Sequence, residues 1–280
     1  MSKRTCEEEV EAPLVKRAKK GRTLRLRNTG AADVRRAMRF KDSVSDVVIQ
    51  NCGVGKMLYD LPPTVRNLTV TGCDGWDESD PLGPFASLEL KTLNLARNYL
   101  GSTLKRIDRL AKLGVLDLSY NRLKNLSVIG SGSEDLVELC LEGNDLRHVQ
   151  NLELLPNLKR LNLSDNDLCC EGALKPLEDL RLEVLNLHRS DLWEGGAEAL
   201  KYLAGMTSLK ELSIPFSSTM IPLGLRPLKE LNLQKLELHT YDGTRIPQES
   251  LQETKVILGL ECIEIHVFQE SPDLETIYLA

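Results

Sequence analysis

The residue pattern most suggestive of chemistry is Gly53-Val54-Gly55-Lys56-Met57, which is similar to a phosphate-binding loop. Such a loop needs the spacing G-x-x-x-x-G-K-[S/T], because backbone N–H groups and the Lys surround the phosphates while the hydroxyl binds the metal. Here Gln50 stands at the first Gly position, and Met57 replaces the hydroxyl residue. The segment is therefore not expected to bind a nucleotide.

Histidine and cysteine, the common ligands of transition metals, are scattered along the chain. None of the four His lies in an H-E-x-x-H pattern, and the seven Cys include no C-x-x-C pair. His188, His239 and His266 share one position of an internal repeat, with a further repeat between the first two. Surface imidazoles and reduced thiols are expected. The chain is predicted not to be an enzyme and to need no metal or cofactor.

The elements that would position a site come from the internal repeat L-x-x-L-x-L-x-x-N-x-L. Complete copies begin at residues 90, 113, 136 and 158, and weaker ones at 44, 65, 182, 209, 233 and 260. Alternate strand residues point to opposite faces, so both Leu of each L-x-L enter a core and the residue between them faces out.

This pattern resembles the leucine-rich repeat family, and the resemblance covers residues 44–268. It implies an α/β solenoid, or horseshoe. A parallel β-sheet forms the concave face of such a fold, and helices or irregular turns form the convex face.

The Asn of the repeat follows the strand, where the chain turns and backbone groups lose their partners. Its side chain can satisfy those groups, so successive copies are expected to form a hydrogen-bonded ladder. Small polar or thiol residues occupy the same position in the weaker copies. The ladder residues are Cys52, Cys73, Asn98, Asn121, Asn144, Asn166 and Ser190.

The segments that return from one strand to the next differ along the chain. Residues 146–158 resemble the short repeats of phosphatase regulators and spliceosomal proteins, with about 22 residues each. Residues 194–206 look like a full helix, as in the longer repeats of the ribonuclease-inhibitor class. A mixed solenoid is therefore expected.

Four segments follow from these patterns. Residues 1–22 are expected to be a basic disordered tail, 23–43 an N-terminal cap, 44–268 a solenoid of about ten repeats, and 269–280 a C-terminal cap strand or tail. Caps are needed because the open end of a solenoid would expose its apolar core. Leu24 and Leu26 are expected to form a first strand in the N-terminal cap.

Function in such a fold is expected on the concave strand surface and in the turns at its rim. Tyr and Arg are the residue types that most often anchor protein interfaces. The template places exposed aromatic, Arg and acidic side chains on this face. The residues expected to contact a partner protein are Arg97, Tyr120, Glu142, Asp165, His188, Arg189 and Phe216.

Two basic clusters, Lys3-Arg4 and Lys16-Arg17-Ala18-Lys19-Lys20, lie eleven residues apart near the N-terminus. The pattern resembles a bipartite nuclear-localisation signal, which implies an import receptor as a partner and a nuclear location, with shuttling to the cytoplasm left open. Acidic residues and Pro13 between the clusters favour disorder. The import residues are Lys3, Arg4, Lys16, Arg17, Lys19 and Lys20.

Charge divides the chain into two parts. Residues 1–27 contain nine Lys or Arg and four Glu, whereas the remainder has a net charge of −10. An acidic body disfavours general binding to nucleic acid, which needs clustered basic residues. No apolar run approaches the ~20 residues of a membrane span, so no membrane partner is expected.

The sequence therefore predicts a non-enzymatic scaffold or adaptor, nuclear, that binds a partner protein on its concave face. Two alternatives stay open. The chain is either a regulatory subunit of a phosphatase or small GTPase, or a ribonucleoprotein component similar to the spliceosomal A-prime class.

Overall fold

The computed structural model describes the body of the chain with several gaps. It covers residues 22–30, 44–101, 104, 110, 112–127, 129, 132–192, 199–215, 223–240, 264–269 and 277–279, with four single positions between 249 and 258. The import residues and Phe216 lie outside these described residues.

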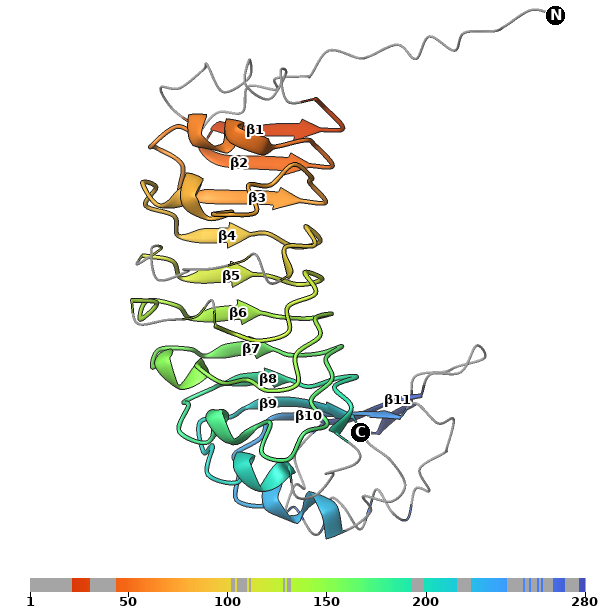
Figure 1. The fold of residues 1–280 in the computed structure, drawn as a ribbon. Coiled ribbons are helices and arrows are strands. Elements are labelled where there is room, and N and C mark those ends of the chain that lie inside the picture. The colour runs from red at the N-terminus through yellow and green to blue at the C-terminus, as the bar shows by residue number, and fades with distance from the viewer. Residues whose placement is uncertain are drawn as a thin grey trace, which may run out of the picture.

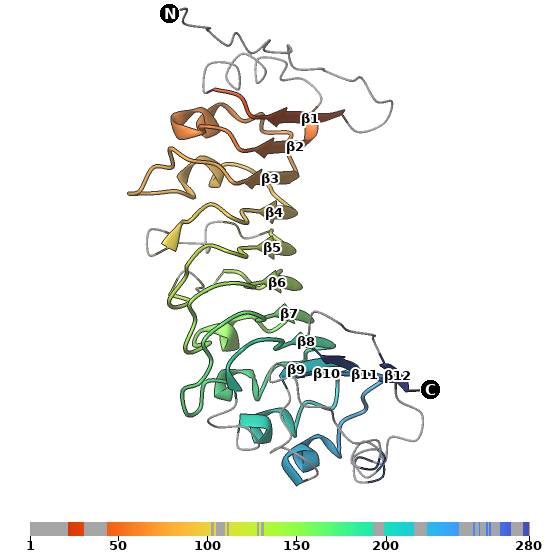
Figure 2. The same cartoon turned by 90° about the vertical axis from the view of Figure 1, so that its right-hand side faces the viewer.

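The described strands form a single sheet whose order follows the chain from β1 to β12, with β1 to β11 labelled in Figure 1 and β12 in Figure 2. Strands β1 to β11 are parallel to their neighbours, and β12 runs antiparallel to β11. The strands are β1 Arg22–Arg27, β2 Val44–Gln50, β3 Asn67–Thr71, β4 Thr92–Asn94, β5 Val115–Asp117, β6 Glu138–Cys140, β7 Arg160–Asn162, β8 Val184–Asn186, β9 Glu211–Pro215, β10 Lys235–Thr240, β11 Glu264–Gln269 and β12 Ile277–Leu279.

From β2 to β10 the register of the sheet follows the repeat. At β11 it does not, because Leu236 and Leu238 of β10 lie opposite Ile265 and Val267, so His266 lies opposite Glu237 and does not share the position of His239 as the repeat predicts. Leu116 in β5 lies opposite Leu93 in β4 and Leu139 in β6, so the same template position meets itself from coil to coil. All three side chains are at most 2% exposed. Burying one Leu per strand in a shared interior stabilises each coil only through its neighbours, because a single coil cannot cover its own apolar face.

Short 3-10 helices and turns form the side opposite the strands, and the strands line the inside of the curve (Figure 2). The described 3-10 helices are η2 Gly55–Asp60, η3 Gly83–Phe85, η6 Leu152–Leu154, η7 Lys175–Leu177, η9 Lys201–Leu203 and η11 Leu223–Leu228. The predicted α/β leucine-rich repeat horseshoe is confirmed, with its sheet concave and its short helices and turns convex.

Asn side chains stack behind the ends of the strands. Oδ1 of Asn121 accepts hydrogen bonds from the backbone N–H groups of Asn98 and Leu100, both at 3.2 Å. Its Nδ2 donates to the carbonyls of Leu95 and Leu118 at 2.8 and 3.0 Å. Asn121 has no exposed surface, so it joins two coils through groups that water cannot reach.

The same arrangement continues toward the C-terminus. Oδ1 of Asn144 accepts from the N–H of Asn121 at 3.1 Å, and Oδ1 of Asn166 accepts from the N–H of Leu146 at 3.1 Å. Ser190 is fully buried at the next ladder position, and its hydroxyl donates to a carbonyl of its own turn. The shorter Ser190 side chain thus bonds to a backbone carbonyl within its own turn.

Thiols take the ladder positions of the N-terminal coils. The N–H of Cys73 donates to Oδ1 of Asn98 at 2.8 Å, and the N–H of Cys52 donates to Sγ of Cys73 at 3.5 Å. The N–H of Thr29 donates in turn to Sγ of Cys52. Burial raises the pKa of Cys73 to about 11, so its thiol stays neutral at physiological pH.

Strands lie in both segments that are expected to be caps. β1 holds Leu24 and Leu26 and pairs with β2 in parallel, so the sheet continues into the segment expected to be the N-terminal cap. β12 lies within the segment expected to be the C-terminal cap. Of the helix predicted over residues 194–206, the described part is helical at 199–200 and continues into η9.

Candidate concave interface

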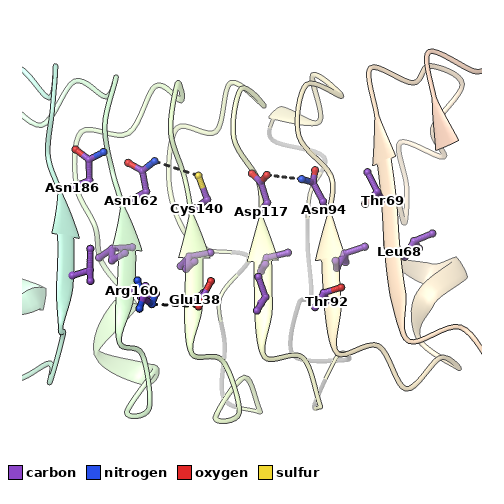
Figure 3. Close-up of a pocket in the computed structure, with 16 residues that line it drawn as sticks. Leu68, Thr69, Thr92, Asn94, Asp117, Glu138, Cys140, Arg160, Asn162 and Asn186 are labelled. Atoms are coloured by element: carbon purple, nitrogen blue, oxygen red, sulfur yellow. Dashed lines mark hydrogen bonds and ion pairs between the residues drawn. The ribbon is translucent and has the colours of Figure 1, made fainter. Parts of the chain in front are cut away.

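A shallow groove of about 490 Å³ runs across the concave face from β3 to β8. Its floor includes a row of outward residues, one from each strand, which from β4 to β8 are the last residues of their strands. Figure 3 shows these side chains side by side in a row across the strands. The row consists of Thr69, Asn94, Asp117, Cys140, Asn162 and Asn186.

Hydrogen bonds and an ion pair between strands hold this floor. Nδ2 of Asn94 donates to Oδ2 of Asp117 at 2.7 Å, and Nδ2 of Asn162 lies 3.5 Å from Sγ of Cys140 (Figure 3). At the other edge of the groove the Arg160 guanidinium pairs with Glu138 at 3.4 Å. The side chains are thus oriented before any partner arrives, which lowers the entropy cost of binding.

Glu142 connects the floor to the rim. Its Oε1 accepts from the Tyr120 phenol at 2.5 Å, and its Oε2 accepts from Nδ2 of Asn162 at 3.1 Å. The hydrogen bond from the Tyr120 phenol to Glu142, together with burial of the phenol, raises the pKa of Tyr120 to about 12. The phenol therefore stays protonated and keeps donating to Glu142 throughout the physiological range.

The rim residues after the strands have left-handed backbone conformations. The φ angles are 61° at Arg97, 55° at Tyr120, 64° at Gly143, 52° at Asp165 and 51° at Arg189. This conformation costs an L-residue other than Gly roughly 1–2 kcal/mol. The turn itself does not require large side chains at these positions, since Gly adopts this conformation without strain.

Arg97 and Tyr120, both predicted contact residues, lie against each other. Cζ of Arg97 is 4.3 Å from the centroid of the Tyr120 ring, which is a cation–π contact. The ring lies over Gly143, where an added Cβ would clash with it. Three consecutive coils therefore contribute to one ordered stack at the rim.

A second contact of the same kind was missed by the sequence analysis. Cζ of Arg122 lies 4.8 Å from the centroid of the Tyr99 ring, and Tyr99 is 68% exposed. The sequence signal for this contact is a tripeptide that recurs in reversed order in consecutive repeats, Arg97-Asn98-Tyr99 and Tyr120-Asn121-Arg122. The repeat template assigns the rim contact positions to the residue before each ladder Asn, whereas Tyr99 and Arg122 follow it.

The remaining predicted contact residues lie further along the sheet. Arg189 and Asp165 form an ion pair at 3.8 Å on adjacent coils. The His188 ring lies 3.9 Å from the His239 ring, two coils away, because Pro215 on the coil between them is short and buried. The structure thus places Arg97, Tyr120 and Glu142 in one group and His188, Arg189 and Asp165 in another.

Metal-ligand clusters and the Cys140 thiol are the remaining chemical features to locate among the described residues. No group of three or more His, Cys, Asp or Glu among the described residues could hold a metal ion. Burial raises the pKa of the Cys140 thiol on the groove floor to about 11, so it is a poor nucleophile at neutral pH. Within the same residues no helix has both the length and the apolar character needed to cross a bilayer.

Sequence comparison finds relatives with leucine-rich repeats but no matching model of a known protein family. The chain is 34% identical to human serine/threonine-protein kinase 11-interacting protein over 152 residues, which are 50% of this chain and 14% of that protein. It is 35% identical to rat leucine-rich repeat-containing G-protein coupled receptor 5 over 118 residues, which are 41% of this chain and 13% of that protein. The chain therefore spans about one seventh of the length of these relatives.

Comparison of folds agrees with the architecture. Internalin C2 from Listeria monocytogenes superposes with a TM-score of 0.52 and 22% sequence identity, covering 74% of this chain and 83% of that chain. A likeness at this identity shows the fold alone. The sheet, the ladder and this comparison define the chain as a leucine-rich repeat solenoid.

Proposed function

We propose that this chain is a non-enzymatic interaction scaffold that binds a partner protein on its concave face. The observation that carries the proposal is the ordered concave surface. Its polar floor is held by bonds between strands, and Arg and Tyr side chains stand at its rim in left-handed turns. A surface fixed in this way favours binding, because few side chains must be immobilised on association.

The composition of the surface indicates a protein partner. Acidic side chains on the face include Asp117, Glu138, Glu142 and Asp165, and they alternate with Arg97, Arg160 and Arg189. Mixed charge together with Tyr suits the rim and anchors of a protein interface. One relative is named for its interaction with a serine/threonine kinase, which supports a role in binding proteins.

Capture of a partner tests this proposal with three variants of the full chain. Cys140→Arg places a long charged side chain on the groove floor, and Tyr120→Ala removes the rim aromatic. We expect the first to weaken the affinity for a partner captured by the wild type roughly tenfold or more, and the second to weaken it several-fold. Asp179→Arg, at an exposed position between η7 and β8, is the matched control and should bind normally.

Thermal unfolding of each variant shows whether the fold is retained. Cys140 is half-buried on the groove floor, with its Sγ 3.5 Å from Nδ2 of Asn162, so the melting temperature of Cys140→Arg shows whether a loss of capture reflects the groove or the fold. Normal capture by Cys140→Arg, or loss of capture only by Asp179→Arg, would contradict the concave assignment. The captured protein also separates the alternatives, since a phosphatase or GTPase favours a regulatory subunit and RNA-processing proteins favour a ribonucleoprotein component.

We further propose that the chain works in the nucleus and enters it through its basic N-terminal clusters. The support is the spacing of Lys3-Arg4 and residues 16–20, which allows both clusters to engage an import receptor at once. A fluorescent fusion of the full chain should be nuclear. Replacing Lys16, Arg17, Lys19 and Lys20 by Ala should shift it to the cytoplasm, and an unchanged distribution would contradict the proposal.

A further inference from the structure

Four residues on two neighbouring coils form what we call the rim quartet: Arg97, Tyr99, Tyr120 and Arg122. Arg97 of one coil stacks on Tyr120 of the next, and Arg122 of the second coil stacks on Tyr99 of the first. All four have φ angles between 54° and 61°. The two Arg–Tyr pairs therefore cross, with one Arg and one Tyr supplied by each coil.

The ladder fixes the backbone beneath the quartet. Asn98 and Asn121 lie between the two members from each coil, and both are buried. The N–H of Asn98 donates to Oδ1 of Asn121, which locks the two turns together. Because the turns are rigid and each guanidinium lies against a ring, little conformational entropy remains to be lost when a ligand binds.

Both guanidinium groups are available to a ligand. Arg97 and Arg122 are exposed, and the described residues provide neither of them with a carboxylate partner. On later coils, by contrast, Arg147, three residues after its ladder Asn, pairs with Asp167 at 2.9 Å, and the rim residue Arg189 pairs with Asp165. A planar guanidinium offers parallel N–H donors that fit a carboxylate in a bidentate manner.

Acidic residues limit the size of the anion that can bind. On the three following coils, six rim positions correspond to the quartet; four of them are Asp, and the other two are Gly143 and Arg189, the latter paired with Asp165. The four are Asp145, Asp165, Asp167 and Asp191. These carboxylates would repel a phosphodiester chain that continued along the rim, whereas a short acidic stretch can end at the quartet. The exposed Tyr99 ring adds an apolar surface next to the two forks.

We infer that the rim quartet binds a short acidic segment of the partner protein, with Arg97 and Arg122 each receiving a carboxylate and Tyr99 contacting an apolar side chain beside them. This inference rests on the proposed function, because it names the chemistry that the partner must carry. It also assigns a binding role to Tyr99 and Arg122, which the concave template does not include.

Fluorescence anisotropy with defined peptides tests the inference on the full chain. The probe is a labelled peptide of twelve residues with four Glu or Asp around one Leu, and the reference peptide carries Gln and Asn instead. The wild type should bind the acidic peptide about tenfold more tightly, and added salt should weaken this binding. Equal binding of both peptides would overturn the inference.

Three variants locate the site. The double variant Arg97→Asn with Arg122→Asn removes both guanidinium groups, and Asn tolerates the left-handed backbone at these positions. Its affinity for the acidic peptide should be about tenfold lower than that of the wild type. Arg97→Lys with Arg122→Lys keeps the charge but not the planar fork, and should lose about threefold. Arg147→Gln is the matched control, an exposed Arg on a later coil outside the quartet positions, and should bind within about twofold of the wild type.

Retained affinity in the Asn double variant would overturn the inference. So would tighter binding of a single-stranded RNA of twelve nucleotides through the same two Arg residues. The Cys140→Arg variant separates this inference from the proposed function. If peptide binding fails while Cys140→Arg still abolishes partner capture, only the quartet assignment is wrong; if Cys140→Arg captures normally, the proposed function itself fails.

Discussion

Replacing Asn121 by Ala is expected to lower the free energy of unfolding by about 3–5 kcal/mol, because several buried backbone groups lose their partner at once. Oδ1 of Asn121 accepts from the N–H groups of Asn98 and Leu100, and the side chain has no exposed surface. Each N–H left unsatisfied in the interior costs about 1–3 kcal/mol.

The position of Asn121 in the middle of the solenoid increases the consequence. Stability in a repeat protein is approximately a sum of coil and interface contributions, so a defect at a central interface weakens the coupling between the two halves. Urea unfolding followed by circular dichroism should show a lower midpoint and a broader transition than the wild type.

Asn125→Ala is the matched control for this prediction. Asn125 lies in the same turn, is exposed, and accepts only one local hydrogen bond, from the N–H of Ser127 at 3.1 Å. Its replacement should cost less than about 1 kcal/mol. An Asn121→Ala protein as stable as Asn125→Ala would show that the ladder contributes little.

Replacing Phe85 by Ala is the second change with a large expected effect, about 3–5 kcal/mol, through the cavity it leaves. Phe85 lies in η3, has no exposed surface and is among the largest fully buried side chains. Its ring meets Trp76 edge to face at a centroid distance of 6.4 Å. Nε1 of Trp76 donates to the carbonyl of Cys73, which ties this irregular coil to the ladder.

The conservative variant Phe85→Leu distinguishes loss of volume from loss of any aromatic at this site. It keeps most of the buried volume and should cost less than about 1.5 kcal/mol. Chemical unfolding of the two variants under identical conditions gives the comparison, with Trp fluorescence as a second signal. Equal stability of Phe85→Ala and Phe85→Leu would mean that the ring is not a packing anchor.

Much of this architecture could be predicted because the repeat and the sheet share one period. Leu93, Leu116 and Leu139 occupy one template position, and they meet in adjacent strands as that position requires. The side chain of Asn121 likewise bonds in the turn that its place in the repeat indicates. Periodicity specifies whether a residue faces the core or the solvent, and this mainly determines which residues make up the interior.

Contacts between side chains at the rim could not be predicted in the same way. The pairing of Arg122 with Tyr99 depends on rotamers and on left-handed backbone, neither of which appears in a pattern of apolar positions. The meeting of His188 with His239 depends on the small Pro215 between them. A template places these residues on a face, but distances across two coils depend on the size of the intervening side chain.

The difference between Asn and Cys at the ladder positions is also informative. Cys52 and Cys73 were predicted to take structural positions, and each Sγ accepts a backbone N–H from the preceding coil. A thiol is a weaker acceptor than an amide oxygen. The N-terminal coils therefore have a weaker ladder than the central ones.

Hydroxyl-radical footprinting of the full chain, alone and bound to its captured partner, tests most directly whether the concave face is the binding surface. Tyr120 and Cys140 lie on the concave side, whereas Tyr59 in η2 and Leu154 in η6 are exposed on the convex side. We predict that the partner lowers the labelling of Tyr120 and Cys140 and leaves Tyr59 and Leu154 unchanged. Protection of Tyr59 and Leu154, with Tyr120 and Cys140 labelled as in the free chain, would contradict the account.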